Sequence, residues 1–325
     1  MASFKYNNVY LSDYSTIVGP LEKNSKLRNF NFYLDDYYYH EKTFEIAEIK
    51  MQKTVIDDLL NKNKMKDIEI NLLLGGDLTN QISITNTCAK NFNIPFLGLY
   101  NACATFPESL IIGANFLNDI KNYNNIITIT SSHNLTAEKQ FRFPIEYGSP
   151  KPKTATFTVT GAVATLLTNV KSKIKIESAT IGKVVDMGII DANNMGAAMA
   201  PAAAWTLMDH LNELKRKSNY YDLILTGDLG CVGKTIFEEY LQRNYNLKLN
   251  NYLDAGCEIY LKKEEFGSGG SGPACLPIVL FNKILFNKKY KKILIIGTGA
   301  LHSPILVHQK NSIPAIAHAV SLEIL

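Results

Sequence analysis

The sequence repeats itself, and this repetition limits the possible folds more than any other feature. The segment LLLGGDL at residues 72–78 is echoed by LILTGDL at 223–229, with Gly76 and Gly227 151 positions apart. A looser match relates TGAVATL at 160–166 to AHAVSLE at 317–323, 157 positions later. Similar offsets predict two equivalent halves, residues 1–170 and 171–325, with a basic, β-prone join around 170–176. The alternative is a chance likeness between apolar strands that end in glycine.

Each half combines a helical pattern with a buried strand. Between residues 41 and 63, apolar side chains recur every three or four positions, which is typical of a helix with one buried face. The short apolar run at 68–74 then predicts a strand. In the second half, a helical stretch at 195–217 is followed by a predicted strand at 222–225. This alternation predicts an α/β fold with largely buried strands.

Composition and charge exclude several classes of protein. The chain has 325 residues, of which 46% are hydrophobic, enough for one large core or two fused smaller ones. Its net charge is only +4 and the basic residues are scattered, so we expect no nucleic-acid partner. No run approaches the roughly 20 apolar residues of a spanning helix, and the N-terminus lacks a signal-peptide pattern. We therefore expect a soluble, cytoplasmic protein, or one that reaches a membrane through a partner.

The cysteines are odd in number and lack metal-ligand spacing. They lie at positions 88, 103, 231, 257 and 275, with no CxxC pair. This pattern argues against a disulfide framework and against a zinc site, and it indicates a reducing compartment.

One cysteine lies in a recognisable turn. YNACATFPESL at 100–110 places Cys103 where a strand ends and a helix begins. This turn resembles the nucleophile turn of thiolases and ketoacyl synthases. Exposed N–H groups at such a helix start can lower the pKa of a thiol and stabilise an oxyanion.

Longer segments narrow the resemblance and extend it from about residue 18 to 323. They are VGPLE at 18–22, GGDLTNQI at 75–82, IPFLGLYNAC at 94–103, SSHNLTAEKQFRFPIEYG at 131–148, DANNMGAAMAPAAA at 191–204, TGDLG at 226–230 and SIPAIAHAV at 312–320. With these segments the chain resembles the stage V sporulation protein AD family, which has a thiolase-like fold.

The resemblance implies a fold, a function and partners. The fold would be a five-layered α/β/α/β/α architecture of two similar halves, with a pocket near Cys103 where the halves meet. The function would be binding of dipicolinic acid (pyridine-2,6-dicarboxylate), or of its calcium chelate, for the SpoVA channel and uptake system in sporulation and germination. The other SpoVA membrane proteins would be its partners, and attachment to the forespore or spore inner membrane would be peripheral. Relatives of this fold also imply a homodimer.

The sequence departs from the catalytic pattern of these relatives. Phe266 stands five residues before Ser271, where thiolases carry a histidine, and Ile295 replaces their second cysteine. Residues 226–228 offer no histidine where the synthases carry one. We therefore expect a binding protein without catalysis, in which Cys103 is a vestigial nucleophile. Two alternatives stay open: a thiolase or ketoacyl-synthase type acyltransferase that uses Cys103, with His133 or His318 close to it in space, and an assembly subunit that binds no ligand.

The segment 131–148 supplies groups suited to a flat ring with two carboxylates. His133 and Asn134 can donate hydrogen bonds, and Arg142 can hold a carboxylate in bidentate fashion. Phe143, together with Phe141 and Tyr147, offers a wall for the ring. The alternative places Arg142 on the surface, beside aromatic residues that only pack.

Two asparagines complete the predicted ligand site. Asn193 and Asn194 precede a run of small residues and can either offer amides to a ligand or cap the helix that follows. Cys103 itself would mark the floor of the cavity, as a structural thiol or as part of the ligand site.

No intrinsic metal or other cofactor is expected. The remaining histidines, at 40, 210, 302 and 308, show no metal-ligand spacing, so calcium would arrive only with the ligand. GSGGSG at 267–272 matches a dinucleotide-binding pattern formally, but no first strand precedes it, and we expect a tight turn there.

Overall fold

Helices and strands follow one another in the same order twice along the chain. The structure, a computed structural model, describes residues 2–25, 27–141, 151–260, 266–286 and 288–325. The first series is β2 (Tyr10–Val18), α2 (Phe44–Asn63), β4 (Leu72–Gly76), α3 (Ser83–Ala89), β5 (Phe96–Gly98), α4 (Thr105–Asp119), β6 (Asn125–Ser132), α5 (Asn134–Phe141) and β8 (Gly161–Thr168). The second is β9 (Ile174–Ile181), α6 (Met195–Glu213), β10 (Leu223–Thr226), α7 (Gly230–Tyr245), β11 (Tyr252–Asp254), α9 (Cys275–Val279), β13 (Lys292–Ala300), α10 (Pro304–His308) and β14 (Ala315–Ile324). A duplicated chain predicts this repeated order.

Shorter elements flank or connect the two series. They are β1 (Ser3–Lys5), α1 (Pro20–Lys23), β3 (Phe32–Tyr33), η1 (Asp67–Glu69), η2 (Asn80–Ile82), η3 (Ala102–Ala104), β7 (Phe157–Thr158), η5 (Ser218–Tyr220), α8 (Ala255–Glu258), β12 (Gly270–Ser271) and η7 (Leu280–Ile284). Within the described ranges, no helix combines the length and the apolarity needed to cross a bilayer.

Each series builds a mixed sheet with the same strand order. The order is β5-β4-β6-β8-β2 in the first half and β11-β10-β13-β14-β9 in the second. In both halves the first three strands are parallel and the last two are antiparallel to their neighbours. The two sheets are joined where β2 pairs with β9 at Tyr10↔Lys175 and Leu11↔Ile174.

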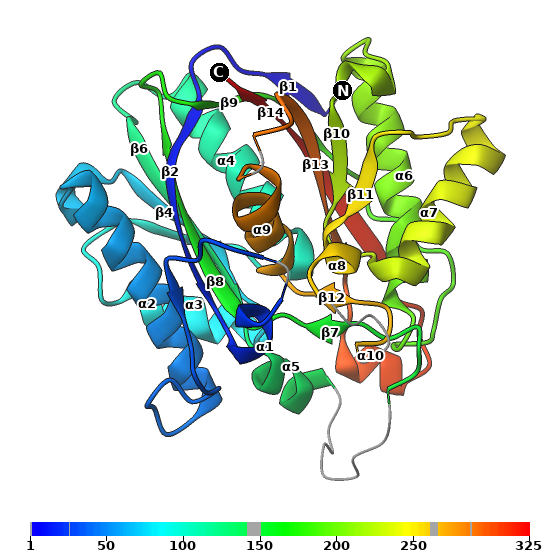
Figure 1. Ribbon diagram of the computed structural model, residues 1–325, viewed down its shortest axis with the longest axis horizontal. Coiled ribbons are helices and arrows are strands. Elements are labelled where there is room, and N and C mark those ends of the chain that lie inside the picture. Colours follow the sequence, from blue (N-terminus) through cyan, green and yellow to red (C-terminus); the bar gives the residue numbers. More distant parts are fainter. Residues whose placement is uncertain (1, 26, 142–150, 261–265, 287) are drawn as a thin grey trace.

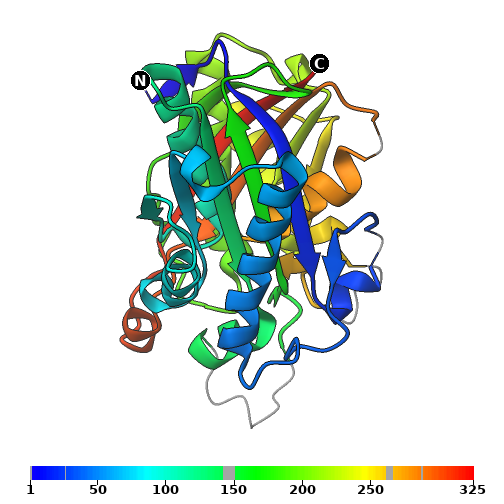
Figure 2. The same ribbon diagram turned by 90° about the vertical axis from the view of Figure 1, so that its left-hand side faces the viewer.

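The elements stack in five layers, as the family resemblance implied. In Figure 1, α4 and α9 lie between the two sheets, while α6 and α7 cover the outer face of the second sheet. Figure 2 shows α2 lying across the outer face of the first sheet. The layers therefore follow the order α/β/α/β/α.

Side chains alternate across the sheets and so divide the hydrophobic core. On β4, Leu72 and Leu74 face the central core, whereas Leu73 faces the outer core under α2. In the central layer, Phe106 of α4 lies edge-on to Phe281, which follows α9, with ring centroids 6.2 Å apart. Both rings are fully buried, so the two halves share one central core.

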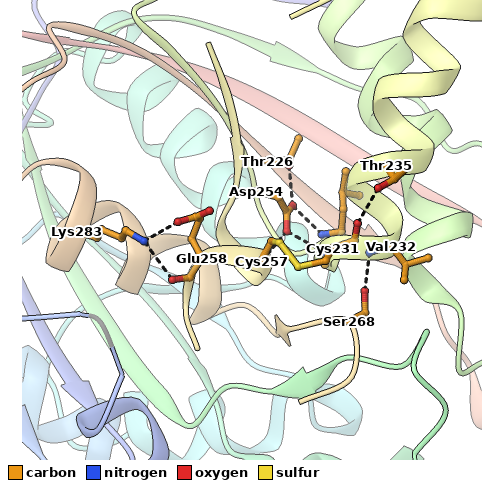
Figure 3. Close-up of a disulfide and its surroundings, with 11 residues drawn as sticks. Thr226, Cys231, Val232, Thr235, Asp254, Cys257, Glu258, Ser268 and Lys283 are labelled. Atoms are coloured by element: carbon orange, nitrogen blue, oxygen red, sulfur yellow. Dashed lines mark hydrogen bonds and ion pairs between the residues drawn. A yellow bond between two sulfur atoms is a disulfide. The ribbon is translucent and has the colours of Figure 1, made fainter. Parts of the chain in front are cut away.

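The expectation of no disulfide is wrong. Cys231 in the first turn of α7 is bonded to Cys257 in α8 (Figure 3). The two cysteines are 26 positions apart in the sequence, but β10 and β11 are neighbouring parallel strands, so the helices that follow them begin side by side. Sequence spacing alone does not show this proximity. Cys88, Cys103 and Cys275 are free thiols.

Candidate functional site

A cavity of about 570 Å³ lies at the carboxyl ends of the parallel strands and is lined by both halves. The first half contributes Cys103, just before α4, and one face of α5. The second half contributes Asp228 after β10, Ala300 at the end of β13, residues 301–304 after it, and the start of α6. Ligands of α/β proteins usually bind at this end of the strands. The cavity is therefore the candidate binding site.

A tight turn presents Cys103 to this cavity. Ala102 has a φ of 47°, in the left-handed region that residues with a Cβ rarely adopt. Its carbonyl oxygen accepts a hydrogen bond from Thr105 Oγ1 at 2.7 Å, which closes the turn at the start of α4. Cys103, the next residue, is partly exposed to the cavity.

Among the described residues, the charged group beside the Cys103 thiol is the carboxylate of Asp228. Burial, followed by the negative charge of Asp228 and the hydrogen bond to it, raises the pKa of Cys103 well above that of an ordinary thiol. Because the thiolate is the nucleophilic form, this environment opposes covalent chemistry at Cys103.

Asp228 is itself buried and firmly held. Its Oδ1 accepts a hydrogen bond from Thr298 Oγ1 at 2.7 Å, and its Oδ2 accepts one from the Gly272 N–H at 3.0 Å. Burial raises the pKa of Asp228 to about 6, although these hydrogen bonds act in the opposite direction. Gly272, with a φ of 106°, belongs to the Gly-rich segment, which forms the predicted tight turn.

An aromatic pair forms another part of the wall. Phe141 of α5 stacks on His302, with ring centroids 5.1 Å apart and planes 27° apart. Burial and the nearby His308 lower the pKa of His302, which favours its neutral form. A flat ring could extend this stack.

The charged side chains of the described lining are acidic. They are Asp228 and Glu138, and Glu138 forms an ion pair with Lys151. Within the described part of the chain, neither lysine nor arginine lines the cavity. Uncharged donors are present, among them the side chains of Asn80 and Ser271.

The structure brings only part of the predicted site together. Cys103 and Asn193 both line the cavity. Asn194 immediately precedes α6 but makes no side-chain capping bond, and its Oδ1 is buried without a hydrogen-bond partner among the described residues. Arg142 and Phe143, like Tyr147, lie outside the described residues.

His133 and Asn134 are buried at the start of α5 and are not among the described lining residues. His133 Nε2 lies 2.9 Å from the Tyr37 carbonyl oxygen, and its ring stacks on Phe44. Asn134 donates to the Thr158 carbonyl oxygen at 3.2 Å. These bonds tie α5 to its neighbours and occupy the donors that the sequence suggested for a ligand.

His318 does not line the cavity either. Its Nε2 lies 2.9 Å from the side-chain amide of Asn101, and its Nδ1 accepts a hydrogen bond from the Gly182 N–H at 3.2 Å. Burial lowers the pKa of His318 to about 4. The residue therefore supports the turn that precedes Cys103.

Sequence reasoning missed two residues of the cavity, Asp228 and His302. Both follow the carboxyl end of a parallel strand, β10 and β13 respectively. The repeated motif that ends in GDL marked the position of Asp228, and the strand-ending segment IIGTG marked that of His302. The position after a buried strand was therefore a usable signal.

Comparisons with known proteins agree with this architecture. A sequence model of the family "Stage V sporulation protein AD" matches residues 2–323. Stage V sporulation protein AD of Bacillus subtilis (strain 168) is 40% identical over 319 residues, which cover 97% of this chain and 94% of that protein.

Solved structures with a similar fold are far more distant in sequence. A cerulenin-bound structure of Xanthomonas campestris OleA has a TM-score of 0.63 at 11% identity and covers 99% of this chain and 98% of that chain. A variant of the same protein gives a TM-score of 0.62 at 13% identity, with 98% and 99% covered. These likenesses show a thiolase-like fold. Together with the match over nearly the whole sequence, they show that the chain belongs to the stage V sporulation protein AD family of sporulation proteins.

Proposed function

We propose that this protein binds dipicolinic acid, or its calcium chelate, in the cavity above Cys103, as the ligand-recognising subunit of the SpoVA channel and uptake system in sporulation and germination. Family membership supports a place in that system. The cavity supports a small ligand, because its volume of about 570 Å³ lies within the usual range for such sites. Partners would be the other SpoVA membrane proteins, with peripheral attachment to the spore inner membrane.

The position of the Asp228 carboxylate beside the Cys103 thiol on the cavity wall carries the proposal that this cavity binds and does not catalyse. Acyl transfer needs a thiolate and a group that handles its proton. Here the neighbouring carboxylate favours the protonated thiol. Slow or absent acyl transfer follows from this arrangement.

The chemistry of the wall suits a flat aromatic acid in part. Phe141 and His302 offer a surface for the ring, while Asn80, Asn193 and Ser271 offer hydrogen bonds to its carboxylates. Asp228 would repel a free dianion, whereas a calcium chelate carries no net charge. Arg142, directly after Phe141 in the sequence, remains a predicted carboxylate ligand. The protein itself is proposed to hold no metal or other cofactor.

Calorimetric titration with dipicolinic acid, with and without calcium, tests the proposed function. Phthalate lacks the ring nitrogen and a pyridine monocarboxylate lacks one carboxylate, so both serve as matched controls. Saturable binding of dipicolinate alone would support recognition of the whole ligand. No binding to either form would leave an assembly subunit as the better description.

The acyltransferase alternative has a separate test at Cys103. Incubation with acyl thioesters of several chain lengths, followed by mass spectrometry, should leave Cys103 unmodified. Covalent labelling that disappears in Cys103→Ala would contradict the non-catalytic proposal.

We also propose that the protein forms a homodimer through the edge strand β5. Among the described residues, β5 pairs with β4 on one side only, and Leu97 on this strand is 44% exposed. An exposed apolar edge strand is a surface for pairing with another chain. Leu97→Lys should convert the dimer into a monomer in light scattering, whereas Ile68→Lys, at an exposed apolar position off the sheet edge, should not. A monomeric unmodified protein would refute the dimer.

A further inference from the structure

Two connecting segments carry the polar wall of the cavity in the second half. Residues 227–229, which follow β10, present Asp228. The Gly-rich segment 267–272 presents Ser271 and the Gly272 N–H that binds Asp228. The first of these segments has no regular structure, and the second contains only the two-residue strand β12, which pairs with β7. Their positions therefore also depend on the groups that they contact away from the cavity.

The first turn of α7 holds the Gly-rich segment. The Cys231 N–H donates to the Ser268 carbonyl oxygen at 2.6 Å, and the Val232 N–H donates to Ser268 Oγ at 3.0 Å. Figure 3 shows Ser268 below this turn, next to the disulfide. Any movement of Cys231 is therefore transmitted to the segment that contains Ser271 and Gly272.

The other cysteine belongs to the group that holds Asp228. The Asp254 Oδ1 atom accepts hydrogen bonds from the Gly230 and Cys257 N–H groups, both at 3.0 Å. Its Oδ2 accepts from the Leu229 N–H at 3.0 Å and from Thr226 Oγ1 at 2.7 Å. The buried Asp254 carboxylate thus connects α8 with the residues before and after Asp228. The disulfide adds a covalent link between α7 and α8 at the same place.

The two cysteines of the disulfide differ in solvent exposure. Cys231 is partly exposed, whereas Cys257 is 7% exposed. An accessible disulfide is more open to thiol exchange than one buried on both sides. The position of Cys231 in the first turn of the 16-residue helix α7 also favours negative charge on its sulfur when the bond opens.

From these contacts we propose that the Cys231–Cys257 disulfide is a redox latch on the cavity wall. In the disulfide form it fixes the positions of Asp228 and the Gly-rich segment, and opening it weakens ligand binding. The inference rests on the proposed function of the cavity, but the movement of the wall can be measured without any ligand.

The proposed reductant is a dithiol. Its thiolate attacks the accessible Cys231 sulfur, the sulfur–sulfur bond breaks, and Cys257 leaves as a thiolate that takes up a proton. The second thiol of the reductant then attacks its own sulfur in the mixed disulfide and releases Cys231. Two protein thiols form while the dithiol becomes a disulfide, so two electrons and two protons pass to the protein.

The first experiment compares ligand affinity in the two redox states of the full chain. Dipicolinate is titrated into the oxidised protein, the protein reduced with a dithiol, and the same sample after reoxidation. We expect affinity to fall about tenfold on reduction and to return on reoxidation, within the usual range for coupling between two sites. Because coupling is reciprocal, saturating dipicolinate should also make the bond harder to reduce.

The second experiment needs no ligand. The rate at which iodoacetamide labels Cys103 on the cavity floor is measured by peptide mass spectrometry in the oxidised protein and in the double variant Cys231→Ser with Cys257→Ser. We expect severalfold faster labelling in the double variant, because a loosened wall exposes Cys103. Cys88→Ser, which removes a buried thiol of the first half, is the matched control and should label Cys103 at the unmodified rate.

The outcomes separate the latch from the proposed function. If neither redox state binds dipicolinate, the proposed ligand is wrong. The rate of Cys103 labelling then still tests whether the disulfide holds the cavity wall. The redox latch would be overturned by equal dipicolinate affinity in both redox states, or by equal rates of Cys103 labelling with and without the disulfide. If the double variant does not fold, labelling of the unmodified protein before and after reduction gives the same comparison.

Discussion

At the scale of single residues, the neighbour of Cys103 determines what the cavity can do. The thiol lies in η3, directly before the start of α4. Its partner is Asp228, a carboxylate held by Thr298 and Gly272. The environment of this pair favours the neutral thiol.

Removing the charge of Asp228 should make Cys103 more reactive. In Asp228→Asn the side-chain amide can keep the contacts to Gly272 and Thr298, because the threonine hydroxyl can turn and accept. A lower pKa of Cys103 means a larger fraction of thiolate, so its rate of alkylation at pH 8 should rise severalfold. Rates measured against pH by mass spectrometry test this result. Ser271→Ala changes an uncharged lining residue and should have little effect, and an unchanged rate in Asp228→Asn would contradict the assigned role.

Glu22 is a second buried carboxyl with an unusual environment. Its Oε1 accepts hydrogen bonds from Tyr260 OH at 2.6 Å and from the Thr160 N–H at 3.2 Å. Within the described ranges, its Oε2 has no hydrogen-bond partner. Burial raises the pKa of Glu22 from 4.5 to about 7, so the folded protein holds this proton more tightly than the unfolded chain does.

The stability contributed by protonated Glu22 should therefore be fully present below pH 4.5 and lost as the pH rises through about 7. Glu22→Gln has no charge to bury, so it should unfold at a higher temperature than the unmodified protein at pH 8. The difference, up to about 3 kcal/mol in the free energy of unfolding, should vanish or reverse at pH 5. Thermal unfolding at both pH values measures it. A difference that does not depend on pH would mean that Glu22 keeps its ordinary pKa.

At the scale of elements, the duplicated motif contains two equivalent glycines, Gly76 and Gly227, whose surroundings differ. A Cβ on Gly76 at the end of β4 would lie 1.8 Å from the Leu99 carbonyl oxygen, a backbone atom that cannot move aside. A Cβ on Gly227, after β10, would lie 3.3 Å from its nearest neighbour, the Thr298 nitrogen. The same substitution therefore meets a clash in one half and a tight contact in the other.

Gly76→Ala should lower the free energy of unfolding by about 3 kcal/mol or more, whereas Gly227→Ala should cost about 1 kcal/mol. Urea unfolding of the two variants provides the measurement, and each variant is the control of the other. Equal effects would show that the surroundings of the two glycines are equivalent.

Local patterns predicted the long helices better than the ends of elements. The helix predicted at 41–63 is α2, which begins at Phe44 because Thr43 caps it and accepts a bond from the Ile46 N–H at 3.3 Å. The strand predicted at 68–74 begins only at Leu72. Its first residues form the turn η1, in which Ile68 is 79% exposed, and an apolar run does not distinguish a strand from the turn that leads into it.

The local turn around Cys103 was enough to place this residue in the cavity, whereas residues that separate strands bring together were missed. The turn around Cys103 is local, and its motif sufficed to place the cysteine in the cavity. Asp228 and His302 arrive there from the ends of two different strands, and the partner of Cys231 is set by the pairing of β10 with β11. These proximities depend on strand order, which the repeat indicated only in outline.

At the scale of the whole molecule, the two halves are similar in topology and share one central core, although each half also has an outer core of its own. Phe281 of the second half stacks on Tyr14 of β2, with ring centroids 4.1 Å apart, and lies edge-on to Phe106 of α4. The pairing of β2 with β9 joins the sheets as well. Because the central core is shared, we expect the two halves to unfold together, although the fold shows the duplication.

The full chain should therefore unfold in one cooperative transition, and residues 1–170 expressed alone should not show one, because separation would expose the central faces of both sheets. Phe281→Ala should lower the stability of both halves together, by about 3–5 kcal/mol, whereas Phe286→Ala, at a position that is 54% exposed, should have little effect. Calorimetry of the full chain, with hydrogen exchange to follow each half, distinguishes these outcomes. If Phe281→Ala released exchange in the second half only, or if residues 1–170 unfolded cooperatively on their own, the halves would be independent domains, and the shared layer of α4 and α9 would be an interface between them.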